Sequence, residues 1–244
     1  MKAMIFAAGL GTRLRPITDT MPKALVKVGG VPMLERVLRK LQSAGIGSFV
    51  VNTFHFAEQI ESFFDRNGNF GAEVAVSRET GGPFETGGGI FHAREQLEGG
   101  RFLVHNVDIL SDLDVQAFLK RDVPGSLATL LLADIPADRY LLFDDDMRLA
   151  GWTNIRTGEV KSPYPDFDPS RYRRYSFCGI HILSDEVFPL MEEDGWPEKF
   201  SIIDFYLRHA AERPIYGVVA DKLRLIDIGS PEKLAEAEAS ADLF

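Results

Sequence analysis

Over residues 1–110, short apolar runs alternate with segments in which apolar side chains recur at helical spacing, and this alternation limits the fold more than any other feature. The runs that predict buried strands are 3–7, 49–52, 74–77 and 102–105. Helical patterns occupy 33–41, 60–64 and 90–97 between them. Because strands that alternate with helices pair in parallel, we expect a doubly wound, mostly parallel, Rossmann-like α/β sheet with helices on both faces.

The pattern changes after Pro124. Residues 140–143 and 148–152 predict a hairpin, and 154–173 is expected to be irregular. Other expected elements are strands at 127–132, 176–183, 215–219 and 223–227, and helices at 184–192, 201–211 and after the capping sequence Ser230-Pro231. The simplest organisation is a single domain, 1–244, in which a doubly wound half, 1–123, precedes an inserted half, 124–244.

Composition narrows the partners and the setting. The 244 residues carry a formal net charge of −9, which argues against a nucleic-acid partner because phosphate backbones are bound by basic surfaces. No apolar run is long enough to cross a membrane, so no membrane association is expected. Cys178 is the only cysteine, so no disulfide framework is expected, and a reducing cytoplasm is the expected location. We expect a monomer or small homo-oligomer that acts on small molecules.

A glycine-rich loop, Gly9-Leu10-Gly11-Thr12-Arg13, directly follows the first predicted strand. Its glycines allow backbone N–H groups to approach a phosphate, and Arg13, Arg15 and Lys23 add cations that suit a triphosphate. The loop fails the dinucleotide fingerprint, because leucine replaces the third glycine and a proline interrupts the following helix. It also lacks the Gly-Lys-Ser/Thr of a P-loop. The alternative is a structural turn with solvated basic residues.

The residues of this loop resemble the signature of the sugar-1-phosphate nucleotidyltransferases. The resemblance covers Ala-Ala-Gly-Leu-Gly-Thr-Arg-Leu-Arg-Pro-Ile-Thr at 7–18 and Pro-Lys-Ala-Leu at 22–25. It implies a GT-A-like nucleotidyltransferase architecture, with a nucleotide-binding half (1–123) and a sugar-binding half (124–244). It also implies that Arg13 grips the phosphates and that Lys23 stabilises charge on the α-phosphate. The nucleotide-binding residues that it implies in the loop are Ala8, Gly9, Gly11 and Thr12.

Two aspartates are candidate ligands for a divalent cation, which nucleotidyl transfer requires. Magnesium prefers one or two carboxylates together with phosphate oxygens and waters. Asp108 and Asp227 each end a predicted strand, where open α/β sheets bind ligands. Both match metal aspartates in motifs of the family, although Val107 replaces the usual glycine beside the first. The resemblance therefore implies an Mg²⁺ site at Asp108 and Asp227, and the alternative is a pair of turn or cap residues.

A second glycine-rich loop spans 79–89 and precedes a predicted helix. Its Glu-Thr-Gly-Gly-Gly-Ile sequence most resembles the bacterial N-acetylmuramate 1-phosphate uridylyltransferases. By that resemblance Glu79 and Gly87 contact the nucleobase. The alternative is a flexible loop that caps the following helix, with Thr86 as the capping residue.

The sugar side is less clearly encoded. Asn106 precedes Asp108 by two residues and is a candidate for sugar hydroxyls, and Gly179 resembles a segment that lines the sugar pocket in the family. The Val-Glu-Lys-Pro motif of several relatives, which supplies a Glu for the sugar and a Lys for its phosphate, is missing. The residue that binds the sugar phosphate is therefore left open. Trp152 is a candidate for stacking on a sugar face, or simply a buried hairpin residue.

Together these features predict an Mg²⁺-dependent enzyme that transfers a nucleoside monophosphate from a triphosphate to a sugar 1-phosphate and releases pyrophosphate. UTP and N-acetylmuramate 1-phosphate are the favoured substrates. The alternatives within the class are a cytidylyl- or guanylyltransferase for phosphocholine or for mannose or heptose 1-phosphate. A non-catalytic nucleotide-sugar-binding regulatory subunit is the alternative from another class. The presence of Lys23 and both aspartates favours the enzyme.

Overall fold

A mixed ten-stranded sheet runs through the computed structural model, which describes all residues 1–244. Its strand order is β11-β10-β9-β12-β6-β1-β4-β5, and β8 joins it through β12 and carries β13. In the first half, β1 (Lys2–Phe6) lies between β4 (Ser48–Thr53) and β6 (Phe102–Asn106), and β5 (Glu73–Arg78) follows β4. All of these pairs are parallel, as the alternating pattern predicts.

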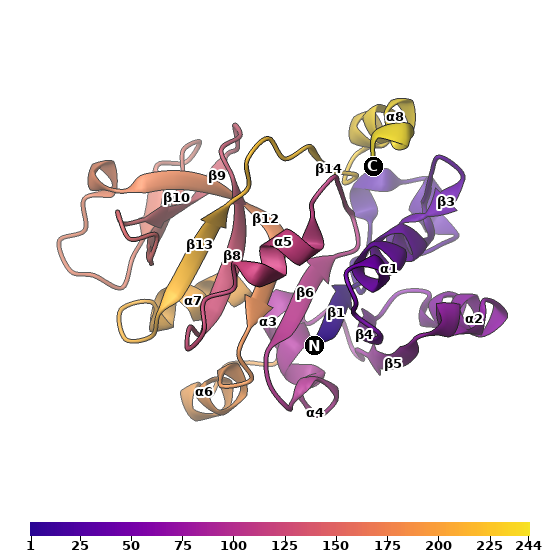
Figure 1. The fold of residues 1–244 in the computed structure, drawn as a ribbon, viewed down its shortest axis with the longest axis horizontal. Coiled ribbons are helices and arrows are strands. Elements are labelled where there is room, and N and C mark those ends of the chain that lie inside the picture. The colour runs from indigo at the N-terminus through magenta and orange to yellow at the C-terminus, as the bar shows by residue number, and fades with distance from the viewer.

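Helices cover both faces of this parallel half because successive residues of a strand point to opposite faces. Ala3 and Ile5 of β1 pack with α1 (Met33–Ser43) and α2 (Ala57–Arg66). Met4 packs instead with α3 (Glu85–His92) and α4 (Arg94–Leu97). The doubly wound α/β prediction is therefore confirmed, with these helices on either side of the sheet (Figure 1).

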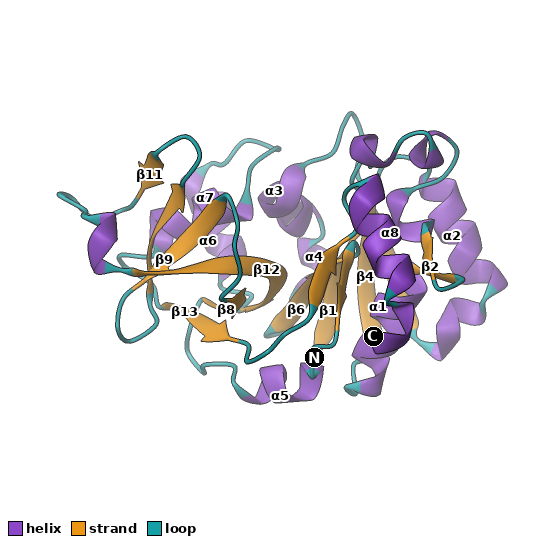
Figure 2. Ribbon diagram, turned by 90° about the horizontal axis from the view of Figure 1, so that it is seen from above, coloured by secondary structure: helices purple, strands orange, loops and turns teal.

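The second half is built around one long strand, β12 (Arg173–Leu183). It runs antiparallel to β6, to β8 (Ala128–Ala133) and to β9 (Arg139–Phe143), so it joins the two halves into one sheet (Figure 2). The predicted hairpin is present as β9 and β10 (Leu149–Asn154). The segment expected to be irregular contains a short strand, β11 (Glu159–Lys161), which extends the hairpin.

The remaining elements surround this sheet. They are α5 (Val115–Lys120), α6 (Val187–Asp194), α7 (Ile202–His209) and β13 (Ile215–Val219). No helix combines the length and the apolar character that a bilayer span requires.

Two short ribbons lie outside the main sheet. One pairs β7 (Ile109–Ser111) with β14 (Leu225–Asp227), and the other pairs β2 (Lys27–Val28) with β3 (Val31–Pro32). The strand predicted near 223–227 therefore exists but is not a strand of the main sheet. The last helix, α8 (Pro231–Ala239), begins at Ser230, whose hydroxyl accepts a hydrogen bond from the Lys233 N–H as the capping sequence predicts.

The second glycine-rich segment is only partly a loop, which corrects the sequence-based expectation. Helix α3 begins at Glu85, so the three glycines 87–89 lie inside it. They are needed for close packing, because a Cβ on Gly87 would overlap the ring of Phe200 and one on Gly88 would overlap a backbone carbonyl. Thr86 does not cap this helix, since its hydroxyl accepts a hydrogen bond from Ile202 N–H.

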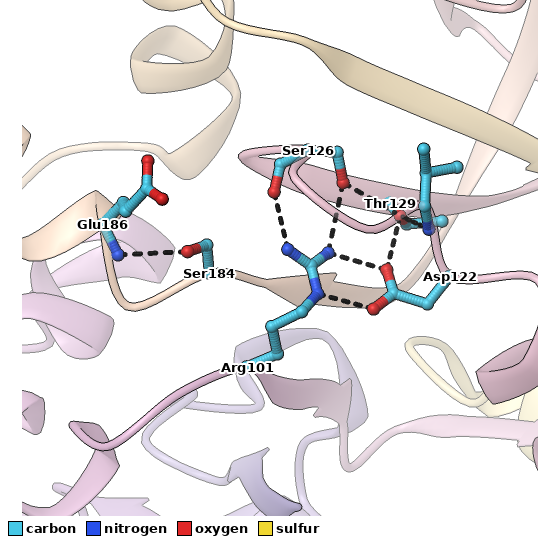
Figure 3. Close-up of polar contacts among 7 residues, drawn as sticks. Arg101, Asp122, Ser126, Thr129, Ser184 and Glu186 are labelled. Carbon is cyan, nitrogen blue, oxygen red and sulfur yellow. Dashed lines mark hydrogen bonds and ion pairs between the residues drawn. The ribbon is translucent and has the colours of Figure 1, made fainter.

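A polar cluster ties the start of β6 to the chain between α5 and β8 (Figure 3). The guanidinium of Arg101 donates to both carboxylate oxygens of Asp122, at 2.5 and 2.6 Å, and to the Ser126 carbonyl at 2.6 Å. Asp122 also accepts from the Thr129 hydroxyl at 2.7 Å. Every charge in the cluster is thus matched by hydrogen bonds, which is the condition under which half-buried ion pairs stabilise a fold.

Candidate active site

The first cavity lies at the carboxyl ends of β1, β4 and β6, where a doubly wound sheet binds ligands. It has a volume of about 370 Å³. The predicted residues that line it are Ala8, Gly9, Lys23, Glu79, Asn106 and Asp108. The structure thus gathers side chains from both glycine-rich segments and from the end of β6 around one space.

Asp108 and Asp227 come together because the short ribbon β7–β14 brings the C-terminal segment back to the end of β6. Asp227 is opposite Ile109 in the ribbon, and the N–H of Ile228 donates to the Asp108 carbonyl at 3.0 Å. The ammonium of Lys23 lies between the carboxylates, 2.5 Å from Asp108 Oδ2 and 3.7 Å from Asp227 Oδ1. Tertiary structure thus places two acids and one cation in contact.

The electrostatics of this group are only partly balanced. Burial, and then the negative charge of Asp108, raise the pKa of the Asp227 carboxyl above its usual value. The positive charges of Lys23 and Arg13 act in the opposite direction but do not cancel the rise. Arg13 is adjacent, since a Cβ on Gly229 would lie 2.7 Å from its guanidinium and 2.8 Å from the Asp227 carboxylate. A further cation bound beside the two carboxylates would therefore stabilise the charged form of Asp227.

Within the first glycine-rich loop, the residues have different surroundings. Ala8 and Gly9 line the first cavity, but Gly11 and Thr12 do not. Gly11 adopts a left-handed conformation (φ 63°), and its carbonyl accepts from the Thr18 hydroxyl, so it shapes the turn. Arg15 is exposed and pairs with Asp19 at 3.2 Å instead of joining the cations at the cavity.

Glu79 and Asn52 link the two glycine-rich segments through a buried network. The Ala7 N–H donates to Asn52 Oδ1 at 2.8 Å, and Asn52 Nδ2 donates to Glu79 Oε1 at 2.7 Å. The Phe84 N–H donates to Glu79 Oε2 at 2.7 Å. Burial raises the pKa of the Glu79 carboxyl, and these hydrogen bonds oppose the rise. Both residues also line the first cavity, so the network fixes the shape of its wall.

Gly87 does not reach the first cavity. Its N–H donates to the Phe200 carbonyl at 2.9 Å, and its Cα faces the Phe200 ring. Its neighbours Glu85 and Thr86 line the cavity instead.

A second cavity, of about 490 Å³, lies on the other side of Asn106. It contains Asp227, Arg13 and Gly179, together with Lys233 from the first turn of α8. Gly179 needs its left-handed conformation (φ 68°), and a Cβ there would lie 2.5 Å from Asn106 Nδ2. Asn106 lines both cavities, so the two candidates for the sugar side do adjoin each other at the boundary.

Sequence reasoning missed Asn52 and Lys233. Asn52 ends a predicted strand, which is the signal that singled out Asp108, but its partner Glu79 could not be deduced from spacing. Lys233 belongs to the helix-capping sequence after Asp227, which was interpreted only as a helix start. Val107, the departure from the family motif, is buried among core residues and does not adopt a positive φ, so a β-branched residue fits there.

Comparisons with known proteins agree with this geometry. Residues 2–137 match the family model described as nucleotidyl transferase. The chain is 44% identical to the N-acetylmuramate alpha-1-phosphate uridylyltransferase of Neisseria meningitidis serogroup B, over 99% of this chain and 98% of that protein. It is 30% identical to the enzyme of the same name from Caulobacter vibrioides, over 97% and 95% of the two chains. A solved structure of UDP-glucose pyrophosphorylase complexed with UDP-glucose has the same fold, with a TM-score of 0.77 at 17% identity and coverage of 99% and 98%.

Proposed function

The chain belongs to the nucleotidyl transferase family and is a nucleotidyltransferase, and we propose that it transfers the uridylyl group of UTP to N-acetylmuramate 1-phosphate with release of pyrophosphate. The identity to two full-length relatives of that name supports both substrates. The same activity would assign the enzyme to cell-wall metabolism in the cytoplasm. We propose that it acts on these small molecules as a monomer or small homo-oligomer, without nucleic acid or membrane.

One observation carries the proposal. Lys23, Arg13, Asp108 and Asp227 converge at the boundary between two adjoining cavities, and Asn106 lines both. A transferase that joins two phosphorylated substrates needs two compartments whose ligands meet at one cationic point. We assign the first cavity to the nucleotide and the second to the sugar phosphate.

The proposed reaction is a single in-line displacement. A phosphate oxygen of the sugar 1-phosphate attacks the α-phosphorus of UTP, and the bond from that phosphorus to the bridging oxygen of the β-phosphate breaks. Lys23 and Arg13 stabilise the charge that accumulates on the α-phosphate. No side chain has to act as a base, because the attacking oxygen is already ionised. The chain's contribution is positioning and electrostatic stabilisation.

Asp108 and Asp227 would hold Mg²⁺. The residues fit this ion, because magnesium takes one or two carboxylates and completes its shell with phosphate oxygens and water. The raised pKa of Asp227, caused by burial and by its proximity to Asp108, indicates two carboxylates that a shared cation would stabilise. When bound, Mg²⁺ would neutralise charge on the triphosphate and on the departing pyrophosphate.

The nucleotide contacts follow from the walls of the first cavity. Ala8 and Gly9 line it, and their backbone N–H groups are the proposed contacts for phosphate or ribose, while Gly11 and Thr12 would act by shaping the loop. We propose that Glu79 orients the base, supported by its place in the cavity wall beside Asn52. Gly87 would act indirectly, by allowing α3 to pack against Phe200. On the sugar side we retain Asn106 and Gly179 and add Lys233 as a candidate for the phosphate.

The test is a pyrophosphate-release assay with Mg²⁺ that crosses UTP, CTP, GTP, ATP and dTTP with a panel of sugar 1-phosphates. We expect release with UTP and N-acetylmuramate 1-phosphate. Release only with GTP or CTP and another acceptor would refute the proposed substrates while leaving the class intact. A folded protein that binds nucleotide but turns over no pair would indicate a regulatory subunit.

A further inference from the structure

A third cavity adjoins the two that we assign to the nucleotide and the sugar phosphate. It has a volume of about 430 Å³ and lies between the strands β9–β12 and the start of α7. It shares Ser201 with the first cavity, and Ser176 and Phe177 with the second. A group attached to the sugar phosphate can therefore extend from the reaction point into this space.

The walls of the third cavity combine aromatic faces with charged side chains. Trp152 and Phe177 supply flat apolar surface, which suits the C–H face of a sugar ring. Lys161 lies over the Trp152 ring, 5.4 Å from its centroid. Its ammonium is 3.1 Å from Asp204 and 3.9 Å from Glu159, so its charge is already compensated by two acids.

Arg139 differs from Lys161 in this respect. It is exposed at the first position of β9 and lines the same cavity, but its guanidinium makes no hydrogen bond, ion pair or cation–π contact within the chain. The acid beside it in sequence, Asp138, pairs with Arg156 instead, at 3.7 Å. Arg139 is therefore the cation in this cavity whose charge and five N–H donors are available to a ligand.

We propose that Arg139 is a specificity-determining residue, which binds a carboxylate carried by the sugar ring of the acceptor. A planar guanidinium pairs best with a planar two-oxygen anion, and the acceptor's phosphate is already assigned to Lys233 at the second cavity. The acceptor class is thus a sugar 1-phosphate with a carboxylate substituent, such as the lactyl ether of N-acetylmuramate. This inference rests on the proposed function.

The experiment compares two acceptors that differ by one charge: N-acetylmuramate 1-phosphate and the analogue whose lactyl carboxylate is a carboxamide. The wild type should prefer the carboxylate by about tenfold in kcat/KM, since a charge-assisted hydrogen bond is made only with that acceptor. Arg139→Gln should reduce the preference to about onefold, through a higher KM for the carboxylate at nearly unchanged kcat. Arg171→Gln, an exposed arginine of the same half outside the cavity, is the matched control and should keep the wild-type preference.

Each outcome bears on a different claim. An unchanged preference in Arg139→Gln, or equal losses with both acceptors, would overturn the role of Arg139 while leaving the uridylyl transfer intact. Inactivity of the wild type with both acceptors, together with pyrophosphate release from another sugar 1-phosphate, would overturn the proposed acceptor and with it the role of Arg139.

Discussion

Two clusters of acidic and basic side chains in this protein differ in how fully their charges are paired within the chain. In the Arg101–Asp122 cluster, both carboxylate oxygens and all three nitrogens of the guanidinium have hydrogen-bond partners (Figure 3). In the Lys23–Asp108–Asp227 cluster, two carboxylates share one ammonium, and the pKa of Asp227 stays raised. The first cluster is complete within the chain, whereas the second keeps a carboxyl group, that of Asp227, whose pKa is raised above its usual value.

The difference separates charged residues that stabilise the fold from charged residues that line the candidate site. Arg101 joins the start of β6 to residues before β8 and so holds the sheet together at the edge away from the cavities. The site cluster lies at the opposite, carboxyl end of β6, where unbalanced charge is available for binding and catalysis at some cost in stability. Substitutions in the two clusters should therefore affect different measurements.

The largest effect is expected for Asp108→Asn. Loss of a carboxylate that we propose as a metal ligand should remove several kcal/mol of transition-state stabilisation, seen as a fall in kcat/KM and a much higher Mg²⁺ requirement in pyrophosphate-release assays. Asp145→Asn, at an exposed site in the hairpin, serves as the control and should behave as wild type. Unchanged activity of Asp108→Asn at low Mg²⁺ would refute the metal assignment.

Lys23→Ala should lower kcat by about 10²–10³-fold, the usual loss when one group that stabilises transition-state charge is removed. UTP binding, measured by calorimetry, should weaken far less, because the interaction strengthens as charge develops. The matched control is Lys27→Ala, an exposed lysine of β2. Equal losses in turnover and binding would make Lys23 a simple anchor for the ligand.

Arg101→Ala should leave kcat nearly unchanged and lower the free energy of unfolding by about 3 kcal/mol, because Asp122 would be left with its charge half-buried and unpaired. Urea unfolding measures this change. Arg173→Ala breaks an exposed ion pair with Asp145 and should cost less than about 1 kcal/mol. Similar losses for the two variants would show that the Arg101 cluster is no more than a surface ion pair.

The smallest effect, and the one of opposite sign, is expected for Asp227→Asn. A carboxyl whose pKa is raised on folding contributes stability below its unfolded pKa, and this contribution is lost as the pH rises through the folded value. At pH 7, with a chelator present, the neutral side chain should therefore stabilise the fold by less than about 1 kcal/mol, since Asp227 is 50% exposed. The gain should vanish on acidification toward pH 3, and a less stable variant at pH 7 would contradict the comparison.

Local sequence patterns predicted much of the fold and several positions of the candidate site. The strand–helix alternation predicted the doubly wound half, and the hairpin and the β14 strand were also found where expected. Asp108 was singled out because it follows a buried strand, and the family signature supplied Arg13 and Lys23. Each of these signals is short-range, since side-chain periodicity, turn residues and motif spacing all operate within one element and its neighbouring loops.

Contacts between distant segments were decided only by tertiary structure. The ribbon β7–β14 brings Asp227 to Asp108, and the close approach of Phe200 explains why 87–89 are glycines within a helix and not a flexible loop. Asn52, Lys233 and Arg139 line their cavities only because segments far apart in the chain fold together. The sequence by itself determined which elements form and which residues end them. Packing of those elements determined which charges are paired within the chain and which are not. The physical reason is that electrostatic energy depends on the distance between charges in space and on their burial, and residue spacing encodes neither.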